Sequence, residues 1–151
     1  MKGSIEEWIV FLKNNPEKVK IQAGVDFDTL QQIKKRYNLP YIPTSYAKLL
    51  RFSNGLVLFG GEVFFFGIDK GDGTISDWNS LYELNQPQFK STMPESEKVL
   101  LIGGNMMGDY FGINYKDKEP EIVYISPELN KAWGYKSLED FMESMWEEWS
   151  E

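Results

Sequence analysis

Apolar residues recur at helical spacing in three segments near the N-terminus of the chain. The first segment follows Ser4, which forms a capping-box pattern with Glu7, and its apolar residues at positions 5, 8, 9 and 12 fall on one helix face. Two further segments, over residues 26–38 and 43–53, have the same periodicity and end at Asn or Asn-Gly. The pattern therefore predicts three helices, each with one apolar face directed at a core.

Beyond residue 55 the pattern changes to short runs rich in Val, Ile, Phe and Tyr that are separated by glycines. Such runs predict strands, here over residues 56–59, 63–68, 99–102, 110–115 and 122–125. A connection as short as Gly60-Gly61 cannot contain a crossover helix, so neighbouring strands are expected to pair antiparallel. Residues 71–97 are the least regular and are expected to contain a short helix or turn around residues 78–84.

The clearest helix lies at the C-terminus, where Ser137 caps and Asp140 occupies the capping-box position. Its apolar residues recur at helical spacing, and the opposite face is mostly glutamate. These apolar residues are Leu138, Phe141, Met142, Met145, Trp146 and Trp149. Helices, then strands, then one closing helix predict an α+β fold: N-terminal helices, a mainly antiparallel sheet of about five to six strands, and a closing C-terminal helix.

The five tryptophans fall into two groups. Trp8, Trp146 and Trp149 lie on apolar helix faces and are expected in or beside the core. Trp78 and Trp133 lie in less regular sequence and are expected to be more exposed. An exposed aromatic residue beside acidic residues is suited to anchor a protein interface.

Composition narrows the possible functions. The chain has 151 residues, 42% of them apolar, which is the size of one globular domain, here residues 1–151. It contains no histidine and no cysteine, which excludes histidine acid–base catalysis, thiol nucleophiles and the commonest zinc and copper ligands. We therefore expect no catalytic residues, no cofactor and no bound metal.

Charge is distributed unevenly along the chain, whose formal net charge is −7. Residues 1–51 carry nine Lys/Arg and five Asp/Glu, whereas residues 52–151 carry seven and eighteen, which gives +4 and −11. An acidic surface repels nucleic acid and anionic membranes and attracts basic partners or cations. It is equally compatible with a role in solubility alone, and charge by itself does not separate the two.

No apolar stretch approaches the roughly 20 residues needed to cross a bilayer. The apolar run at residues 9–12 is also far too short for the core of an export signal. We therefore expect a cytoplasmic protein.

Two glycine-containing segments resemble ligand-binding motifs without matching them. An EF-hand loop starting at Asp69 would need glutamate at its twelfth position, where Ser80 stands. A dinucleotide-binding loop over residues 103–108 would need glycine where Asn105 stands and a helix after it, but an aromatic strand follows. The second segment is expected instead to turn one strand into the next, with Asp109 at the turn exit.

Paired carboxylates can hydrolyse glycosides without histidine, which makes a carboxylate glycosidase one hypothesis. The candidates are Asp69, Asp72, Asp77, Glu83 and Asp109. Because no spacing singles out an acid and its partner, this is the weakest of the functions considered.

The segment from residue 42 to residue 55, IPTSYAKLLRFSNG, resembles the signature of the SMI1/KNR4 family, also called the SUKH superfamily. In that signature a (L/I)-P-x-x-(Y/F)-x-x-(L/F)-(L/F) helix runs into an Asn-Gly stop before the first strand. The matching residues are Pro43, Tyr46, Leu49, Leu50, Asn54 and Gly55, for which we favour structural roles in starting, packing and capping the helix. The helices and strands on either side of this segment also follow the order found in the family, so the resemblance extends over roughly residues 20–149.

The resemblance implies a non-enzymatic binding domain. Bacterial members of the family resemble immunity proteins that neutralise a polymorphic toxin, often a nuclease or a deaminase, and fungal relatives regulate cell-wall synthesis and signalling. The implied partner is a cognate toxin domain with a basic surface, bound without direct contact to nucleic acid or membrane. A general regulatory or scaffold module of the same fold is the alternative.

Two acidic patches could meet such a partner. The first comprises Asp69, Asp72, Asp77, Trp78, Glu83 and Asp109, and the second comprises Glu143, Glu147 and Glu148. The first is favoured because loops with an aromatic residue form specific contacts more readily than a uniformly charged helix face.

Overall fold

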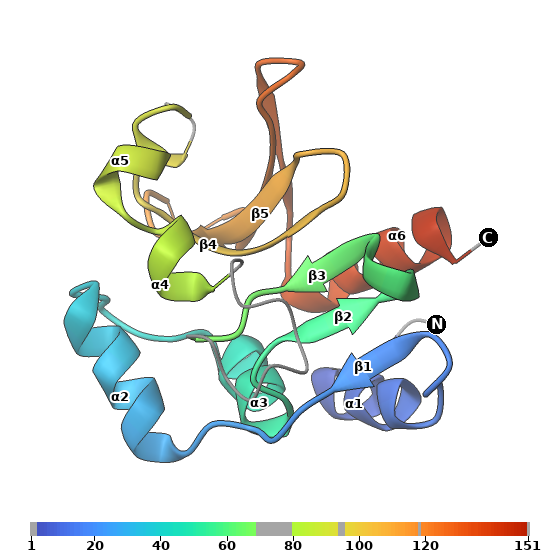
Figure 1. Ribbon diagram of the computed structural model, residues 1–151. Helices are drawn as coiled ribbons and strands as arrows, with labels where there is room; N and C mark the ends of the chain where they lie inside the picture. The colour runs from blue at the N-terminus through green and yellow to red at the C-terminus, as the bar shows by residue number, and fades with distance from the viewer. Residues whose placement is uncertain (1–2, 69–79, 94–95, 118, 151) are drawn as a thin grey trace.

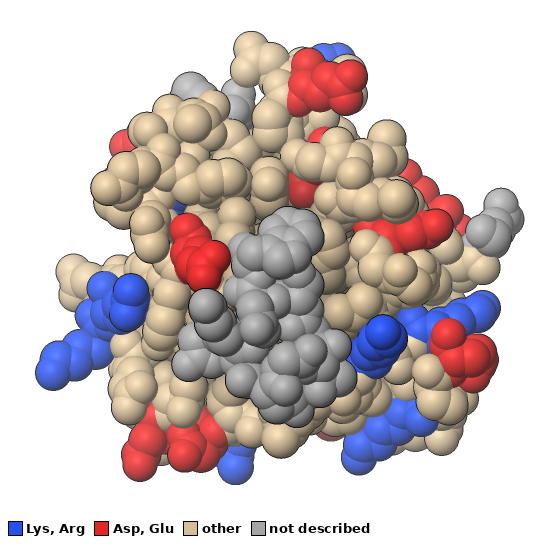
Figure 2. Space-filling model, viewed as in Figure 1, with Lys and Arg blue, Asp and Glu red and all other residues tan. Residues whose placement is uncertain are grey.

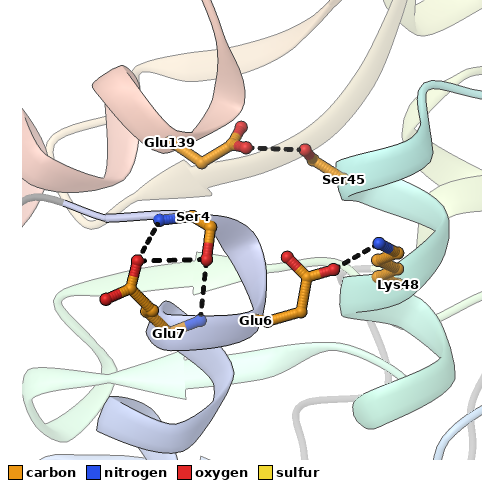
Figure 3. Close-up of polar contacts among 6 residues, drawn as sticks. All are labelled: Ser4, Glu6, Glu7, Ser45, Lys48 and Glu139. Atoms are coloured by element: carbon orange, nitrogen blue, oxygen red, sulfur yellow. Dashed lines mark hydrogen bonds and ion pairs between the residues drawn. The ribbon is translucent and has the colours of Figure 1, made fainter.

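The computed structural model describes residues 3–68, 80–93, 96–117 and 119–150 (Figure 1). The first helix, α1, spans Ile5–Lys13, and the predicted capping box is present: the Ser4 hydroxyl accepts from the Glu7 amide while the Glu7 carboxylate accepts from the Ser4 amide (Figure 3). The other two predicted helices are also present. They are α2 (Phe27–Arg36), capped by the Asp26 side chain, and α3 (Thr44–Phe52).

The sheet has seven strands in chain order, and every neighbouring pair is antiparallel. They are β1 (Val19–Ile21), β2 (Leu56–Leu58), β3 (Val63–Phe65), β4 (Val99–Asn105), β5 (Tyr110–Asn114), β6 (Ile122–Ser126) and β7 (Lys131–Tyr135). The α+β class, the antiparallel pairing and the five predicted strands are confirmed. The expected count of five to six strands is one or two below the observed seven, and the strands that no predicted range covers are the two edge strands, β1 and β7.

The two edge strands lack the sequence pattern by which the others were predicted. β1 has only three residues, too few to establish a period. Four of the five residues of β7 are exposed and the fifth is half-buried, so no alternation of apolar and polar residues marks it. Both strands exist because a neighbouring strand supplies hydrogen-bonding partners.

Over the residues that the structure describes, a 3-10 helix, η1 (Phe59–Gly61), and three α-helices follow in the C-terminal two thirds of the chain. α4 (Leu81–Leu84) lies in the stretch 78–84, where a short helix or turn was expected, and α5 (Pro87–Lys90) was not predicted. The closing helix α6 spans Leu138–Trp149 and has Ser137 as its cap, as predicted. Among the described residues, no helix is long and apolar enough to cross a membrane.

Helices from both ends of the chain meet on one side of the fold. α1 and α6 each contact α3, and α6 also contacts β7 (Figure 1). Polar contacts link α3 to both of these helices. Ser45 on α3 donates to the Glu139 carboxylate on α6 at 2.9 Å, and Lys48 on α3 pairs with Glu6 on α1 (Figure 3). Beneath them lies one continuous apolar core that includes Trp8, as expected.

The glycines at residues 103 and 104 do not form a turn, contrary to the prediction. Both lie inside β4, and only Gly108, with φ of 86°, is in the turn that follows. A Cβ atom built on Gly103 would lie 2.3 Å from Cζ of Phe111 and 2.5 Å from the carbonyl oxygen of Phe64. These glycines therefore serve close packing inside the sheet.

Candidate functional site

Exposed apolar side chains gather at one end of the sheet. Seven large apolar residues are exposed in the described part of the chain, and four of them are Met106, Met107, Leu129 and Trp133, with 67%, 64%, 62% and 42% of their surface exposed. The β4–β5 and β6–β7 turns lie at the same sheet end because β4 and β6 both run antiparallel to β5. We call this region, residues 105–109 and 124–133, the strand-end surface (upper right and top of Figure 1).

A buried asparagine holds the β4–β5 turn in shape. Oδ1 of Asn105 accepts from the amides of Met107 at 3.0 Å and Asp109 at 3.2 Å. Its Nδ2 donates to the Tyr124 hydroxyl at 2.7 Å, and that hydroxyl donates to the Asp109 carboxylate at 2.5 Å. Asn105 is 5% exposed and Tyr124 and Asp109 are half-buried, so the network joins the turn to β6 in a partly buried position.

The Tyr124 hydroxyl stays protonated in this setting. Burial raises its pKa above the ordinary value, and the hydrogen bond to the Asp109 carboxylate raises it further. Tyr124 is therefore a neutral ring whose hydroxyl proton points at the Asp109 carboxylate.

A small pocket opens between α6 and strands β3–β7 of the sheet. Its volume is about 110 Å³, and the residues around it are Val63, Asn105, Phe111, Tyr124, Trp133, Tyr135, Phe141, Met145, Glu148 and Trp149. Glu148 is the one carboxylate among them. Trp133 lies opposite Tyr124 across β6 and β7, with ring centroids 4.9 Å apart, and forms the exposed wall of the pocket.

The structure thus brings together two candidates that the sequence had placed in separate patches. Asp109, from the first patch, bonds to Tyr124, and Glu148, from the second, lines the pocket beside the same ring. Glu143 and Glu147 do not line this pocket. Asn105 and Tyr124 were not predicted as site residues, because only strand pairing shows that they are neighbours. Trp133 was expected to be exposed, but its position beside them was not predicted.

Of the remaining first-patch candidates, only Glu83 is among the described residues, and it lies elsewhere. Glu83 is exposed on α4, whose neighbour Asn85 bonds to Leu101 in the middle of β4, whereas Asp109 follows the far end of that strand. Asp69, Asp72, Asp77 and Trp78 lie outside the described residues. The two described glycosidase candidates, Glu83 and Asp109, are therefore on different parts of the surface. In the described part of the chain, no cluster of acidic side chains is arranged to hold a metal ion.

The residues of the helix signature pack inside the molecule. Tyr46, Leu49 and Leu50 are each 2% exposed, and Pro43 precedes the first turn of α3. The Asn54 side chain accepts from the Ile68 amide at 2.8 Å. Gly55 has φ of 87°, and a Cβ on it would lie 2.6 Å from the amide nitrogen of Gly67, so glycine is required there. None of these groups faces the pocket beside Trp133.

Three wider cavities lie elsewhere in the described part of the chain, of about 420, 380 and 350 Å³, and the first and the last differ in chemical character from the pocket beside Trp133. The first adjoins the start of α2, where the Asp26 carboxylate is already engaged by the Thr29 amide and hydroxyl. The last is lined by Lys90 and Lys98, and the ammonium of Lys90 donates to the Val99 carbonyl. Neither combines carboxylates with exposed aromatic residues as the strand-end surface does.

We expect the Asn105→Ala substitution to lower the free energy of unfolding by about 1–3 kcal/mol, because it removes three hydrogen bonds and leaves buried groups unpaired. Urea unfolding measures this loss, and amide hydrogen exchange of Met107 and Asp109 should accelerate. Gln88→Ala, at an exposed position on α5, is the control. Unchanged exchange at both amides would show that Asn105 does not hold the turn.

A sequence model of the SMI1 / KNR4 family (SUKH-1) matches residues 24–144 of the chain. The match includes both turns of the strand-end surface, whereas α1, β1 and the last residues of α6 lie outside it. No curated protein matches the chain significantly.

Proposed function

Because the chain belongs to the SMI1 / KNR4 family (SUKH-1), we propose that it is a non-enzymatic immunity protein that binds and neutralises one cognate toxin domain. The observation that carries the proposal is the strand-end surface, where exposed Trp133 shares a pocket with Tyr124 and Glu148. Tyr124 bonds to Asp109, and the two turns expose Met106, Met107 and Leu129. The proposal implies a cytoplasmic location, where a producing cell has to block the toxin. It needs no catalytic residue in this chain.

The charge distribution supports a basic partner. On the face shown in Figure 2, most Lys and Arg side chains lie in the lower half, over α1, α2 and β1, whereas the upper half carries mostly Asp and Glu. This agrees with the net charges of +4 and −11 for residues 1–51 and 52–151. A toxin that acts on nucleic acid presents a basic surface to phosphates, and an acidic inhibitor is steered toward that surface.

The exposed apolar side chains supply the close contacts of an interface, which charge attraction alone does not provide. Exposed tryptophan is the residue type most enriched among interface hot spots, and methionine adapts its shape to a partner. Both types occur at the strand-end surface within reach of carboxylates, which suits an apolar centre with a charged rim. The first patch, with Asp69, Asp72, Asp77 and Trp78, remains part of the proposal as a second contact region.

The test uses the toxin domain encoded beside the gene for this chain. We expect Trp133→Ala to raise the Kd for that domain by about thirtyfold, equivalent to about 2 kcal/mol, as for a hot-spot residue. Isothermal titration measures the Kd, and thermal unfolding checks that the variant is folded. Phe27→Ala is the matched control, because Phe27 is an aromatic residue on α2 with 60% of its surface exposed.

Equal affinities of wild type and Trp133→Ala would remove the strand-end surface from the proposal. Capture of several weakly bound housekeeping proteins, with no toxin domain encoded nearby, would favour the alternative of a regulatory or scaffold module.

A further inference from the structure

The pocket beside Trp133 is walled mainly by aromatic rings. Tyr124 and Trp133 form its outer side, Tyr135 and Phe141 approach with ring centroids 5.2 Å apart, and Trp149 closes the α6 side. Its volume of about 110 Å³ corresponds to roughly three or four water molecules, the size of the end of one side chain.

The pocket also carries negative charge. Glu148 lines it, and Asp109 lies behind the Tyr124 hydroxyl. In the part of the chain that the structure describes, the only ion pair joins Lys48 and Glu6, so Glu148 has no basic partner there. Aromatic faces and a carboxylate both attract a cation, and each becomes more effective where water is partly excluded.

Other occupants fit this chemistry poorly. A carboxylate or phosphate would be repelled by Glu148 and by the ring faces. An aliphatic side chain would bury part of Glu148 without supplying a partner, which costs free energy. A guanidinium group is planar, can stack on Trp133 or Tyr124, and can donate two hydrogen bonds to one carboxylate.

We infer that this pocket receives an arginine side chain of the basic partner, stacked against Trp133 and Tyr124 and paired with Glu148. The inference rests on the proposed function, since it names the group of the partner that the strand-end surface recognises. It also explains why Asp109 and Glu148, far apart in the sequence, converge on Tyr124.

The inference can be tested without the toxin. N-acetyl-arginine amide is titrated against the full chain, and tryptophan fluorescence and the indole NMR signal of Trp133 report binding. We expect a Kd on the order of millimolar for a single side chain. N-acetyl-citrulline amide, which has nearly the same shape and no charge, should bind at least about fivefold more weakly.

Two neighbouring glutamates supply a matched pair of variants. Glu148→Gln should weaken binding of the arginine probe at least about fivefold. Glu147→Gln removes the same charge from the preceding residue of α6 and should leave the Kd unchanged. Thermal unfolding establishes that both variants are folded.

Equal binding of the arginine and citrulline probes, equal effects of the two glutamine variants, or no binding up to about 100 mM would each overturn the arginine pocket. These results leave the proposed function standing if Trp133→Ala still weakens toxin binding. Conversely, selective arginine binding by a chain that binds no toxin would retain the pocket and reject the immunity role.

Discussion

Replacing Trp8 by alanine is expected to lower the free energy of unfolding by about 3–5 kcal/mol. Trp8 is 0% exposed, and its ring meets Phe11 edge-on at 5.5 Å and lies 6.2 Å from Trp146. This cluster joins α1 to α6, and both tryptophans lie outside the family-matched residues 24–144. A loss of this size is a large fraction of the stability of an ordinary domain.

Urea unfolding followed by circular dichroism measures the effect of Trp8→Ala. Val10→Ala is the control, because Val10 lies on the same helix with 57% of its surface exposed, and it should change the unfolding free energy by less than about 0.5 kcal/mol. A loss at Trp8 below about 1 kcal/mol would mean that α1 is not part of the cooperative core. The prediction therefore tests whether the domain extends beyond the residues that the family model covers.

Two substitutions of Tyr46 are expected to affect the free energy of unfolding differently. Its side chain is 2% exposed, and its hydroxyl oxygen is buried without a hydrogen-bond partner among the described residues. Tyr46→Ala empties a core position and should cost about 3–5 kcal/mol. Tyr46→Phe keeps the ring and removes an uncompensated polar group, so the free energy of unfolding should stay the same or rise by up to about 1 kcal/mol.

Alkaline pH provides a second measurement at this residue. Burial raises the pKa of Tyr46 in the folded protein, whereas the unfolded chain has a tyrosine pKa of about 10. Above about pH 10 the unfolded state therefore binds fewer protons than the folded state, and stability falls as pH rises.

Tyr46→Phe removes the share of this decline that belongs to Tyr46. Urea unfolding at pH 8 and at pH 10.5 should show a smaller drop for Tyr46→Phe than for wild type. A Tyr46→Phe variant that is more than 1 kcal/mol less stable than wild type at pH 8 would show that the hydroxyl has a partner.

Much of the fold could be predicted from local patterns. Capping residues such as Ser4, Asp26 and Ser137 stand directly before the helices that they begin. Buried strands such as β4 and β6 are marked by continuous or frequent apolar residues. The exposed edge strand β7 could not be predicted, because hydrogen bonds to β6, and not burial, define it.

The candidate site was only partly predictable, for a related reason. The acidic character of Asp109 and Glu148 and the exposure of Trp133 could be expected from sequence. That these three residues lie close together could not be expected from sequence, because Tyr124 connects them only when β5, β6 and α6 pack side by side. In the sequence, Asn105 only breaks a nucleotide-binding motif, whereas in the structure its side chain shapes the turn.

The sequence by itself therefore determined the longer helices, the five inner strands and their antiparallel pairing, the acidic balance and the absence of histidine and cysteine chemistry, because each depends on residue type or on spacing along the chain. Only the tertiary structure decided that the glycines of β4 pack inside the sheet and that two separate acidic segments share one aromatic pocket. Both depend on contacts between strands and helices distant in sequence, which no local period encodes.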